Sequence, residues 1–191
     1  MTKIERIEVA LSAWKGREEA CDLCPRRCRT DRRAGPSGFC RTGVKAVVAS
    51  SLLHFGEEPV LSGLSDGCVP ETGRRRRLGS GTIFFCGCNL RCLFCQNYQI
   101  SWLRRGRPVE DEELAGLMLD LERQGALNIN LVSPTQSLLP ILRALRLALI
   151  RGLSLPLVYN TNGYERADVL ERLAGIRSEE HTSELQSRGL I

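Results

Sequence analysis

The chain has 191 residues, of which 42% are hydrophobic and 26% are charged, and its formal net charge is +5. This composition excludes a disordered chain and suffices for one packed domain with a small appendage. Aromatic residues make up only 5% of the chain, so bases of single-stranded nucleic acid have few surfaces to stack on. The arginine-rich runs at 26–33 and 74–77 therefore indicate solvated loops, and nucleic acid is not an expected partner.

The cysteine content bears on the cellular compartment. The chain contains nine cysteines, yet residues 1–20 carry charges throughout and lack the apolar core of a secretory signal. Arg143, Arg146 and Arg151 interrupt the longest apolar stretch, so no membrane span is predicted. A cytoplasmic location is expected. In a reducing compartment, clustered cysteines are more often metal ligands than disulfides.

The N-terminal region combines a helix with a group of cysteines. Apolar residues recur with helical spacing over 4–20 and predict an amphipathic helix. Four thiols follow with the spacing Cys-x2-Cys-x3-Cys-x11-Cys, and they belong to Cys21, Cys24, Cys28 and Cys40. This spacing suits zinc and a [4Fe–4S] cluster equally well, so both remain open for a possible second metal site. Buried thiols without any metal are the alternative.

Residues 44–50 predict a strand, and the following segment to Gly63 contains His54 and Glu58, which we expect to make local hydrogen bonds. Residues 64–78 read as an exposed insertion loop that carries Cys68. The expected organisation is a helix and cysteine-rich region at 1–63, this loop, a β/α domain at 79–176 and a tail at 177–191. The roles of Cys68 and Cys86 stay open.

The central stretch is residues 79–101, which read GSGTIFFCGCNLRCLFCQNYQIS. Residues 82–85 predict a buried strand, and Cys88, Cys92 and Cys95 follow it directly. Thiolates are soft ligands that favour zinc, copper(I) or iron–sulfur clusters. A structural zinc usually takes four ligands, and Cys86 is the nearest fourth candidate, although it lies in the predicted strand. A cubane held by three cysteines instead leaves one iron open for chemistry.

The rest of the chain alternates helices and strands. Helices are predicted at 108–124, 138–151 and 165–174, and strands at 127–133 and 155–160. Acidic residues at 110–113 favour a helix N-terminus through the helix dipole. The fold class is therefore α/β, with three strands expected to pair in parallel.

The three-cysteine motif, with the aromatic Phe94 before its last cysteine, resembles that of the radical S-adenosylmethionine (SAM) superfamily. The flanks Gly-Cys-Asn-Leu-Arg-Cys from Gly87 and Cys-Gln-Asn-Tyr-Gln-Ile-Ser from Cys95 are similar to the branch of pyruvate formate-lyase activating-enzyme homologues. The resemblance implies the N-terminal half, three β/α units, of a partial TIM-like barrel. It also implies a [4Fe–4S] cluster on Cys88, Cys92 and Cys95, with SAM on the fourth iron, a 5′-deoxyadenosyl radical that abstracts hydrogen, and a reductant such as flavodoxin or ferredoxin.

By position, the resemblance places the SAM pocket at the ends of the later strands. Many relatives carry Gly-Gly-Glu after the second strand, whereas this chain has Val132-Ser-Pro-Thr135. Ser133 and Thr135 are therefore candidates for the SAM contact, with Asn160 after the third strand and Phe94 in the loop. Backbone N–H groups of Gly87, Asn89 and Leu90 are candidate donors to sulfur. The radical's target is not identified: activating enzymes act on a glycine of a partner protein, and distant homologues act elsewhere.

The C-terminal residues 177–187 resemble a translated sequencing-library adapter, so 177–191 is expected to be an artefactual tail outside the fold. The third strand should then end the sheet with an open edge, and the isolated fragment should be poorly soluble and inactive. The rival reading of the whole chain is a non-catalytic, cysteine-rich zinc module that contacts nucleic acid through its arginines.

Overall fold

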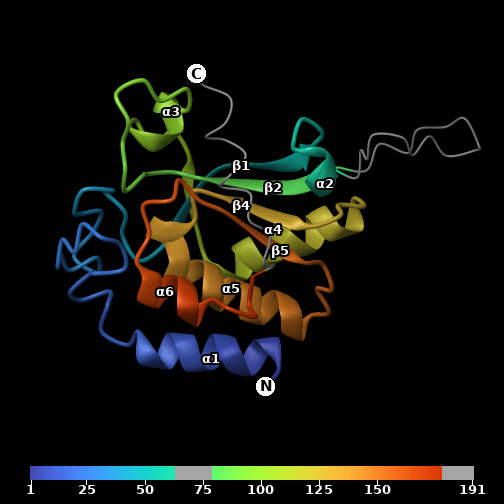
Figure 1. Cartoon of the computed structure of the whole chain (residues 1–191), viewed down its shortest axis with the longest axis horizontal. Helices are drawn as coiled ribbons and strands as arrows, with labels where there is room; N and C mark the ends of the chain where they lie inside the picture. Colours follow the sequence, from blue (N-terminus) through green and yellow to red (C-terminus); the bar gives the residue numbers. More distant parts are fainter. Residues whose placement is uncertain (63–78, 178–191) are drawn as a thin grey trace, which may run out of the picture.

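The computed structural model describes residues 1–62 and 79–177 (Figure 1). The expected insertion loop, with Cys68 and the arginines at 74–77, and nearly all of the expected tail lie outside the described residues. The helices are α1 Lys3–Ala13, α2 Pro59–Ser62, α3 Tyr98–Ser101, α4 Asp111–Arg123, η1 Thr135–Ser137, α5 Leu138–Ile150 and α6 Ala167–Arg172. The strands are β1 Ala46–His54, β2 Ser80–Phe85, β3 Arg107–Val109, β4 Ile129–Val132 and β5 Leu157–Asn160.

The strands form one mixed sheet in the order β3-β1-β2-β4-β5. β2, β4 and β5 are parallel neighbours, with Thr82 opposite Asn130 and Asn130 opposite Val158. The predicted α/β class and the parallel pairing of these three strands are confirmed, and β5 lies at one end of the described sheet. β1 pairs antiparallel with both β2 and β3, an arrangement that the sequence did not predict.

Two predicted boundaries near this sheet were wrong. β1 continues to His54 instead of ending at Ser50, because Ser51–His54 pair with Ser80–Ile83 beyond an irregularity between Val48 and Ser50. The start of the predicted helix at 108–124 belongs to β3, and α4 begins at Asp111. Pro108 lies in the terminal strand β3, where its missing N–H costs little.

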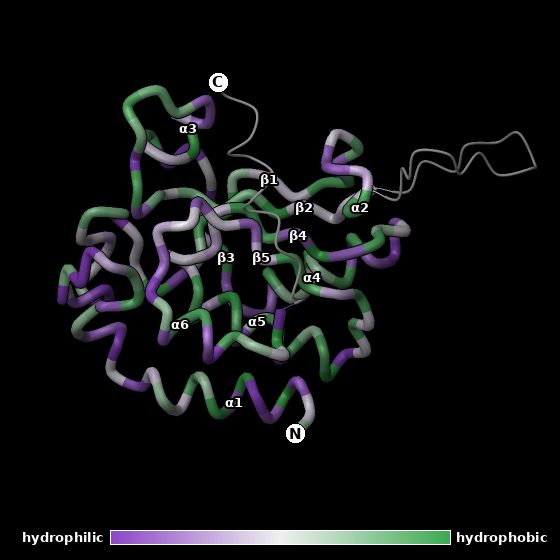
Figure 2. The backbone as a smooth tube through the Cα atoms, viewed as in Figure 1, coloured by the Kyte–Doolittle hydropathy of each residue, from purple (hydrophilic) through white to green (hydrophobic). Residues whose placement is uncertain are grey.

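Three helices, α4, α5 and α1, cover one face of the sheet in two layers. α4 and α5 pack together beneath the strands, and α1 lies outermost against α5 (Figures 1 and 2). Alternate strand residues such as Ile83, Phe85 and Leu131 join the buried apolar cluster shared with these helices. Thr82 and Asn130 have the opposite parity, so the sheet's other face is more polar. No helix in residues 1–62 or 79–177 is long and apolar enough to span a membrane.

The first helix is shorter than predicted. It begins with a capping box, in which the Thr2 side chain accepts from the Glu5 amide and the Glu5 carboxylate accepts from the Thr2 amide. It ends at Ala13 instead of Ala20, because the chain turns after Trp14 and Gly16 adopts the left-handed conformation at φ +86°. Residues 15–20, which follow the helix, lead to Cys21.

Candidate functional site

The three-cysteine loop, residues 88–95, follows the carboxyl end of β2. The carboxyl ends of the parallel strands β4 and β5 meet at the same edge, where the Ser133 amide donates to the Asn160 carbonyl at 2.9 Å. A cavity of about 130 Å³ opens between these strand ends and the loop. Crevices at the carboxyl ends of parallel strands are where α/β proteins commonly bind ligands.

All three thiols of the loop line this cavity. Cys88 is buried, whereas Cys92 and Cys95 are partly exposed. Gly87 and Leu90 from the loop, and Ser133 and Asn162 from the ends of the parallel strands, also line it. The structure therefore brings the three predicted ligands to one solvent-accessible hollow.

Three nitrogen donors point at the Cys88 sulfur. The amides of Leu90 and Arg91 lie 3.3 and 3.4 Å from it, and the Asn162 side-chain amide lies 3.4 Å from it. N–H groups that donate to a ligand sulfur are a common feature of metal and iron–sulfur sites. The donor at Leu90 was predicted. Asn162 was not singled out, although it lies within the turn after β5 where pocket residues were expected.

The remaining two cysteines are fixed by α3 and the residue after it. The Trp102 indole N–H donates to the Cys92 carbonyl at 3.2 Å, and the Ser101 hydroxyl lies 3.3 Å from the Cys95 sulfur. The Arg91 guanidinium stacks over the Trp102 ring, 4.0 Å from its centroid. These contacts pack the loop back on itself and hold the two thiols at the cavity.

Cys86 does not lie in this cavity. It is fully buried, its amide donates to the Val47 carbonyl at 2.8 Å, and its sulfur packs against Gly106 so closely that a methyl group there would come within 2.5 Å. Burial raises the pKa of the Cys86 thiol. Cys86, the nearest candidate in sequence for a fourth ligand, therefore faces away from Cys88, Cys92 and Cys95.

The four predicted SAM-contact residues are not all brought to the cavity. Ser133 lines it, in a left-handed conformation at φ +55°. Phe94 is 89% exposed in the loop, and Thr135 is buried beneath the strand ends. Asn160 contributes its carbonyl to the Ser133 amide, and its side chain is not among those that line the cavity.

Thr135 instead belongs to a polar network behind the cavity. Its hydroxyl and that of Thr161 donate to Glu165 Oε1, and the Tyr159 hydroxyl donates to Thr135 at 3.4 Å. The second carboxylate oxygen of Glu165 is buried and makes no hydrogen bond to any residue that the structure describes. Burial raises the pKa of Glu165, and it also raises the pKa of Tyr159, with a further contribution from the Glu165 charge.

The raised pKa of Glu165 predicts a pH-dependent stability. The favourable contribution of Glu165 to the free energy of unfolding is complete below the pKa that its carboxyl has in the unfolded chain. It is lost as the pH rises through the higher pKa that this carboxyl has in the folded chain. Glu165→Gln keeps an acceptor oxygen for both threonines and removes the buried charge. We expect this variant to be more stable than the parent by about 1 kcal/mol at neutral pH, and no more stable in acid. Thermal melts between pH 4 and 8 measure this, with exposed Glu171→Gln as control; parallel curves for Glu165→Gln and the parent would contradict it.

The four cysteines of the N-terminal region, called here the four-cysteine site, surround a separate small cavity. Burial raises the pKa of the Cys24 thiol, the Arg26 amide lowers it, and the nearby thiols of Cys40, Cys21 and Cys28 raise it further. The four thiols are thus close enough to interact. Among the described residues, no three Cys, His, Asp or Glu side chains are already arranged to hold a metal ion, so binding at either group of cysteines requires side-chain adjustment.

Comparison with known proteins agrees with this geometry. The family model described as Radical SAM superfamily matches residues 82–178, just over half of the chain. The chain is also 32% identical over 180 residues to "Uncharacterized protein MJ0674" of Methanocaldococcus jannaschii, covering 90% of this chain and 46% of that protein. It therefore spans less than half of the relative's length. No solved structure matches the chain significantly. The matched segment covers more than half of the chain and includes most of β2, the three-cysteine loop and both later parallel strands, so the chain belongs to the radical SAM superfamily.

Proposed function

We propose that Cys88, Cys92 and Cys95 hold three irons of a [4Fe–4S] cluster and that the chain takes part in reductive cleavage of SAM. Membership of the superfamily implies a [4Fe–4S] cluster and SAM in general. The observation that supports these particular ligands is the shared cavity: all three thiols line it, and Cys86 does not. A three-thiolate set fits a cluster with one open iron better than it fits a closed zinc site.

When bound, the cluster supplies the electron that splits SAM into methionine and a 5′-deoxyadenosyl radical for hydrogen abstraction. The chain's own residues prepare the site for it. The donors from Leu90, Arg91 and Asn162 contact the Cys88 sulfur, and hydrogen bonds to a ligand sulfur tune the reduction potential of a bound cluster. Ser133 and Asn162 supply polar groups on the cavity wall that suit the amino and carboxylate groups of SAM, while Leu90 and Ile100 add apolar surface that limits water.

For the whole protein we propose a glycyl-radical-enzyme-activating type of activity, on the motif flanks similar to pyruvate formate-lyase activating-enzyme homologues. Residues 79–176 would then be the first three β/α units of a partial barrel. A protein substrate and a reductant such as flavodoxin or ferredoxin are part of this proposal. SAM contacts at Phe94, Thr135 and Asn160 also belong to it, and they require the loop and strand ends to shift when SAM binds.

Anaerobic reconstitution with iron and sulfide tests the proposal. The chain should become brown and contain iron and sulfide in about equal amounts, about four of each per chain. With dithionite and SAM it should release 5′-deoxyadenosine, measured by chromatography. A colourless protein that binds only zinc at these three cysteines would overturn the assignment and favour the zinc-module alternative. A chain with a cluster and no SAM cleavage would support the ligands and show that this chain alone does not cleave SAM.

A further inference from the structure

The four-cysteine site encloses a space for a single ion. Cys21 and Cys40 are buried, Cys24 and Cys28 are partly exposed, and all four thiols line one small cavity of about 10 Å³. This volume accommodates about one water-sized sphere. A cubane with four irons and four sulfides is far larger, whereas a zinc ion with four thiolates about 2.3 Å away needs little more than this space.

Local backbone turns bring the four cysteines together. The Arg29 amide donates to the Cys21 carbonyl at 2.7 Å, and the Cys21 amide donates to the Thr30 carbonyl at 3.1 Å, so the chain doubles back between Cys21 and Cys28. The Arg27 amide donates to the Cys24 carbonyl at 3.0 Å in a tight turn with Arg27 at φ +43°. These turns form without a disulfide, and they bring the four cysteines to the lining of one cavity.

Gly38 completes the site by returning the fourth ligand. It adopts φ +71°, and a methyl group on it would lie 3.4 Å from Cys28 Cβ and 3.5 Å from its sulfur. Glycine therefore lets the chain pass directly against Cys28 before Cys40.

A buried arginine next to the site requires negative charge. Arg32 is only 5% exposed, and one of its guanidinium nitrogens lies 3.7 Å from the Cys40 sulfur. Its other hydrogen bond goes to the neutral Gln136 carbonyl at 2.5 Å, and it forms no salt bridge with any carboxylate in the described ranges. A buried guanidinium without an anion is costly. One zinc with four thiolates carries a net charge of −2 and offsets it.

We infer that the four-cysteine site binds one zinc ion through its four thiolates, and that this zinc-bound segment positions the three-cysteine loop. The first half of the inference is independent of the proposed function. The second half rests on it, because the loop is taken as the cluster-binding element. Zinc binding releases the thiol protons to solvent and involves no redox step.

The backbone of the segment contacts the loop where the ligands begin. The Cys40 carbonyl lies against Gly87, where a methyl group would approach it to 2.7 Å. The Arg26 side chain donates to the Asn89 carbonyl at 3.1 Å, and Arg91 donates to the Phe39 carbonyl at 3.2 Å. The residues before and after Cys88 are thus held by the chain segments that flank the four-cysteine ligands.

A second connection runs through Arg32. Its guanidinium holds the Gln136 carbonyl, while the Gln136 side chain donates to the carbonyls of Gly87 at 2.9 Å and Ser133 at 2.7 Å. Asn89 extends the same contact region, since its side chain donates to the Tyr164 carbonyl at 2.7 Å and accepts from Asn162 at 2.8 Å. The Asn162 side chain, which donates to the Cys88 sulfur, is therefore connected through Asn89 to Arg26 in the four-cysteine region.

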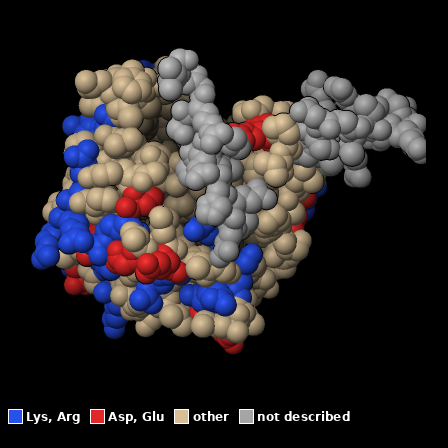
Figure 3. Space-filling view, in the orientation of Figure 1, with Lys and Arg blue, Asp and Glu red and all other residues tan. Residues whose placement is uncertain are grey.

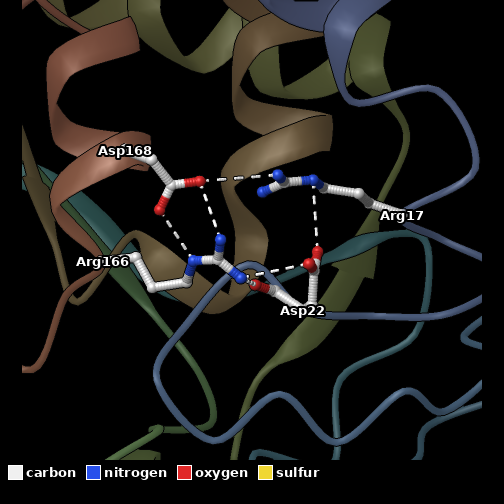
Figure 4. Close-up of polar contacts among 4 residues, drawn as sticks. All are labelled: Arg17, Asp22, Arg166 and Asp168. Carbon is white, nitrogen blue, oxygen red and sulfur yellow. Dashed lines mark hydrogen bonds and ion pairs between the residues drawn. The ribbon is translucent and has the colours of Figure 1, made fainter.

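The segment is also tied to the start of α6. Arg166 donates to the Asp22 carbonyl at 2.9 Å and to its carboxylate at 3.1 Å, while it also pairs with Asp168 (Figure 4). Arg17 completes the network by pairing with both aspartates. In the same region basic and acidic side chains lie side by side on the molecular surface (Figure 3). Asp22 follows Cys21, so this network fixes the first ligand of the site relative to the sheet.

Metal analysis of the full chain tests the zinc half. The variant with Cys88, Cys92 and Cys95 all changed to serine removes the other thiol group. We expect it to retain about one zinc per chain and negligible iron. Cobalt(II) substitution should give the intense thiolate-to-metal absorption of a tetrahedral four-sulfur site. Changing Cys24 to serine in that variant should lower zinc affinity at least about tenfold, and Cys86→Ser should not. Iron with sulfide in the first variant, or zinc that is insensitive to Cys24→Ser, would overturn the inference.

Hydrogen exchange of the chain before iron reconstitution tests the positioning half. Removing zinc with a chelator should raise amide exchange over 86–92 at least about tenfold, whereas exchange in α5 should change little. This comparison uses the chain without any substitution, so it holds even where a cysteine variant fails to fold. Zinc removal with unchanged exchange over 86–92 would overturn the positioning role. Failure of SAM cleavage in a zinc-loaded chain would count against the proposed function alone.

Discussion

Replacing Cys92 by serine is expected to reduce the iron content of the reconstituted chain from about four atoms to less than about one. Cys92 is one of three thiols on the cavity, and no other cysteine of the described chain is placed to substitute for it. A cubane with two protein ligands and two open irons is labile. Release of 5′-deoxyadenosine should fall to background, because under the proposed function SAM cleavage would need an assembled cluster.

Cys86→Ser is the matched control for this experiment. It removes a thiol only six residues away, yet that thiol is buried against Gly106 and does not line the cavity. Its iron content and absorbance should therefore equal those of the parent, apart from a loss of stability from the buried hydroxyl. Equal iron loss in both variants, or full iron retention in Cys92→Ser, would remove the basis for the three-ligand assignment. Circular dichroism before reconstitution separates ligand loss from misfolding.

The sequence predicted the elements in which apolar residues recur with the spacing of a helix or a strand. The strands at Thr82, Asn130 and Val158 and the helices that follow them are short apolar or amphipathic segments with turn residues between them. It predicted a strand at 44–50 but neither the continuation of β1 to His54 nor its antiparallel pairing, and it did not predict β3. Serines at 50 and 51 break the alternation of β1 where its pairing is irregular, and β3 has only three residues. Pairing between distant segments leaves little trace in local composition.

The candidate site likewise has a part that the sequence predicted and a part that it did not. The three-cysteine ligands are close in sequence, so their proximity in space follows from spacing alone. The third donor to Cys88 comes from Asn162, 74 residues away, and only the parallel pairing of β2, β4 and β5 brings it there. Arg32 was predicted to be part of a solvated arginine run, yet it is buried. Composition predicts the average exposure of the arginine run. The burial of Arg32 depends instead on its contact with Gln136, which lies 104 residues further along the chain.

Gly87→Ala is expected to destabilise the chain by about 2 to 3 kcal/mol and to lower its iron loading several-fold. Gly87 adopts φ +82°, and a methyl group there would lie 2.7 Å from the Cys40 carbonyl and 3.0 Å from the Thr42 hydroxyl. Both atoms belong to buried residues, so neither can rotate out of the way. The added carbon must push the four-cysteine segment away from Cys88 or turn the backbone that carries Cys88.

Two further glycines, one inside α4 and one just after it, separate these causes. Gly125→Ala introduces the same kind of backbone strain, since Gly125 has φ +90° and nothing within 4 Å of an added methyl group. It should cost about 1 to 2 kcal/mol and leave iron loading unchanged. Gly116→Ala, inside α4 and also without a neighbour within 4 Å, should stabilise the chain by about 0.5 to 1 kcal/mol. Denaturant unfolding and iron analysis of the three variants measure both quantities. The iron loss in Gly87→Ala beyond that in Gly125→Ala reports the contact between the two groups of cysteines, and equal iron loading in these two variants would show that this contact does not position the ligands.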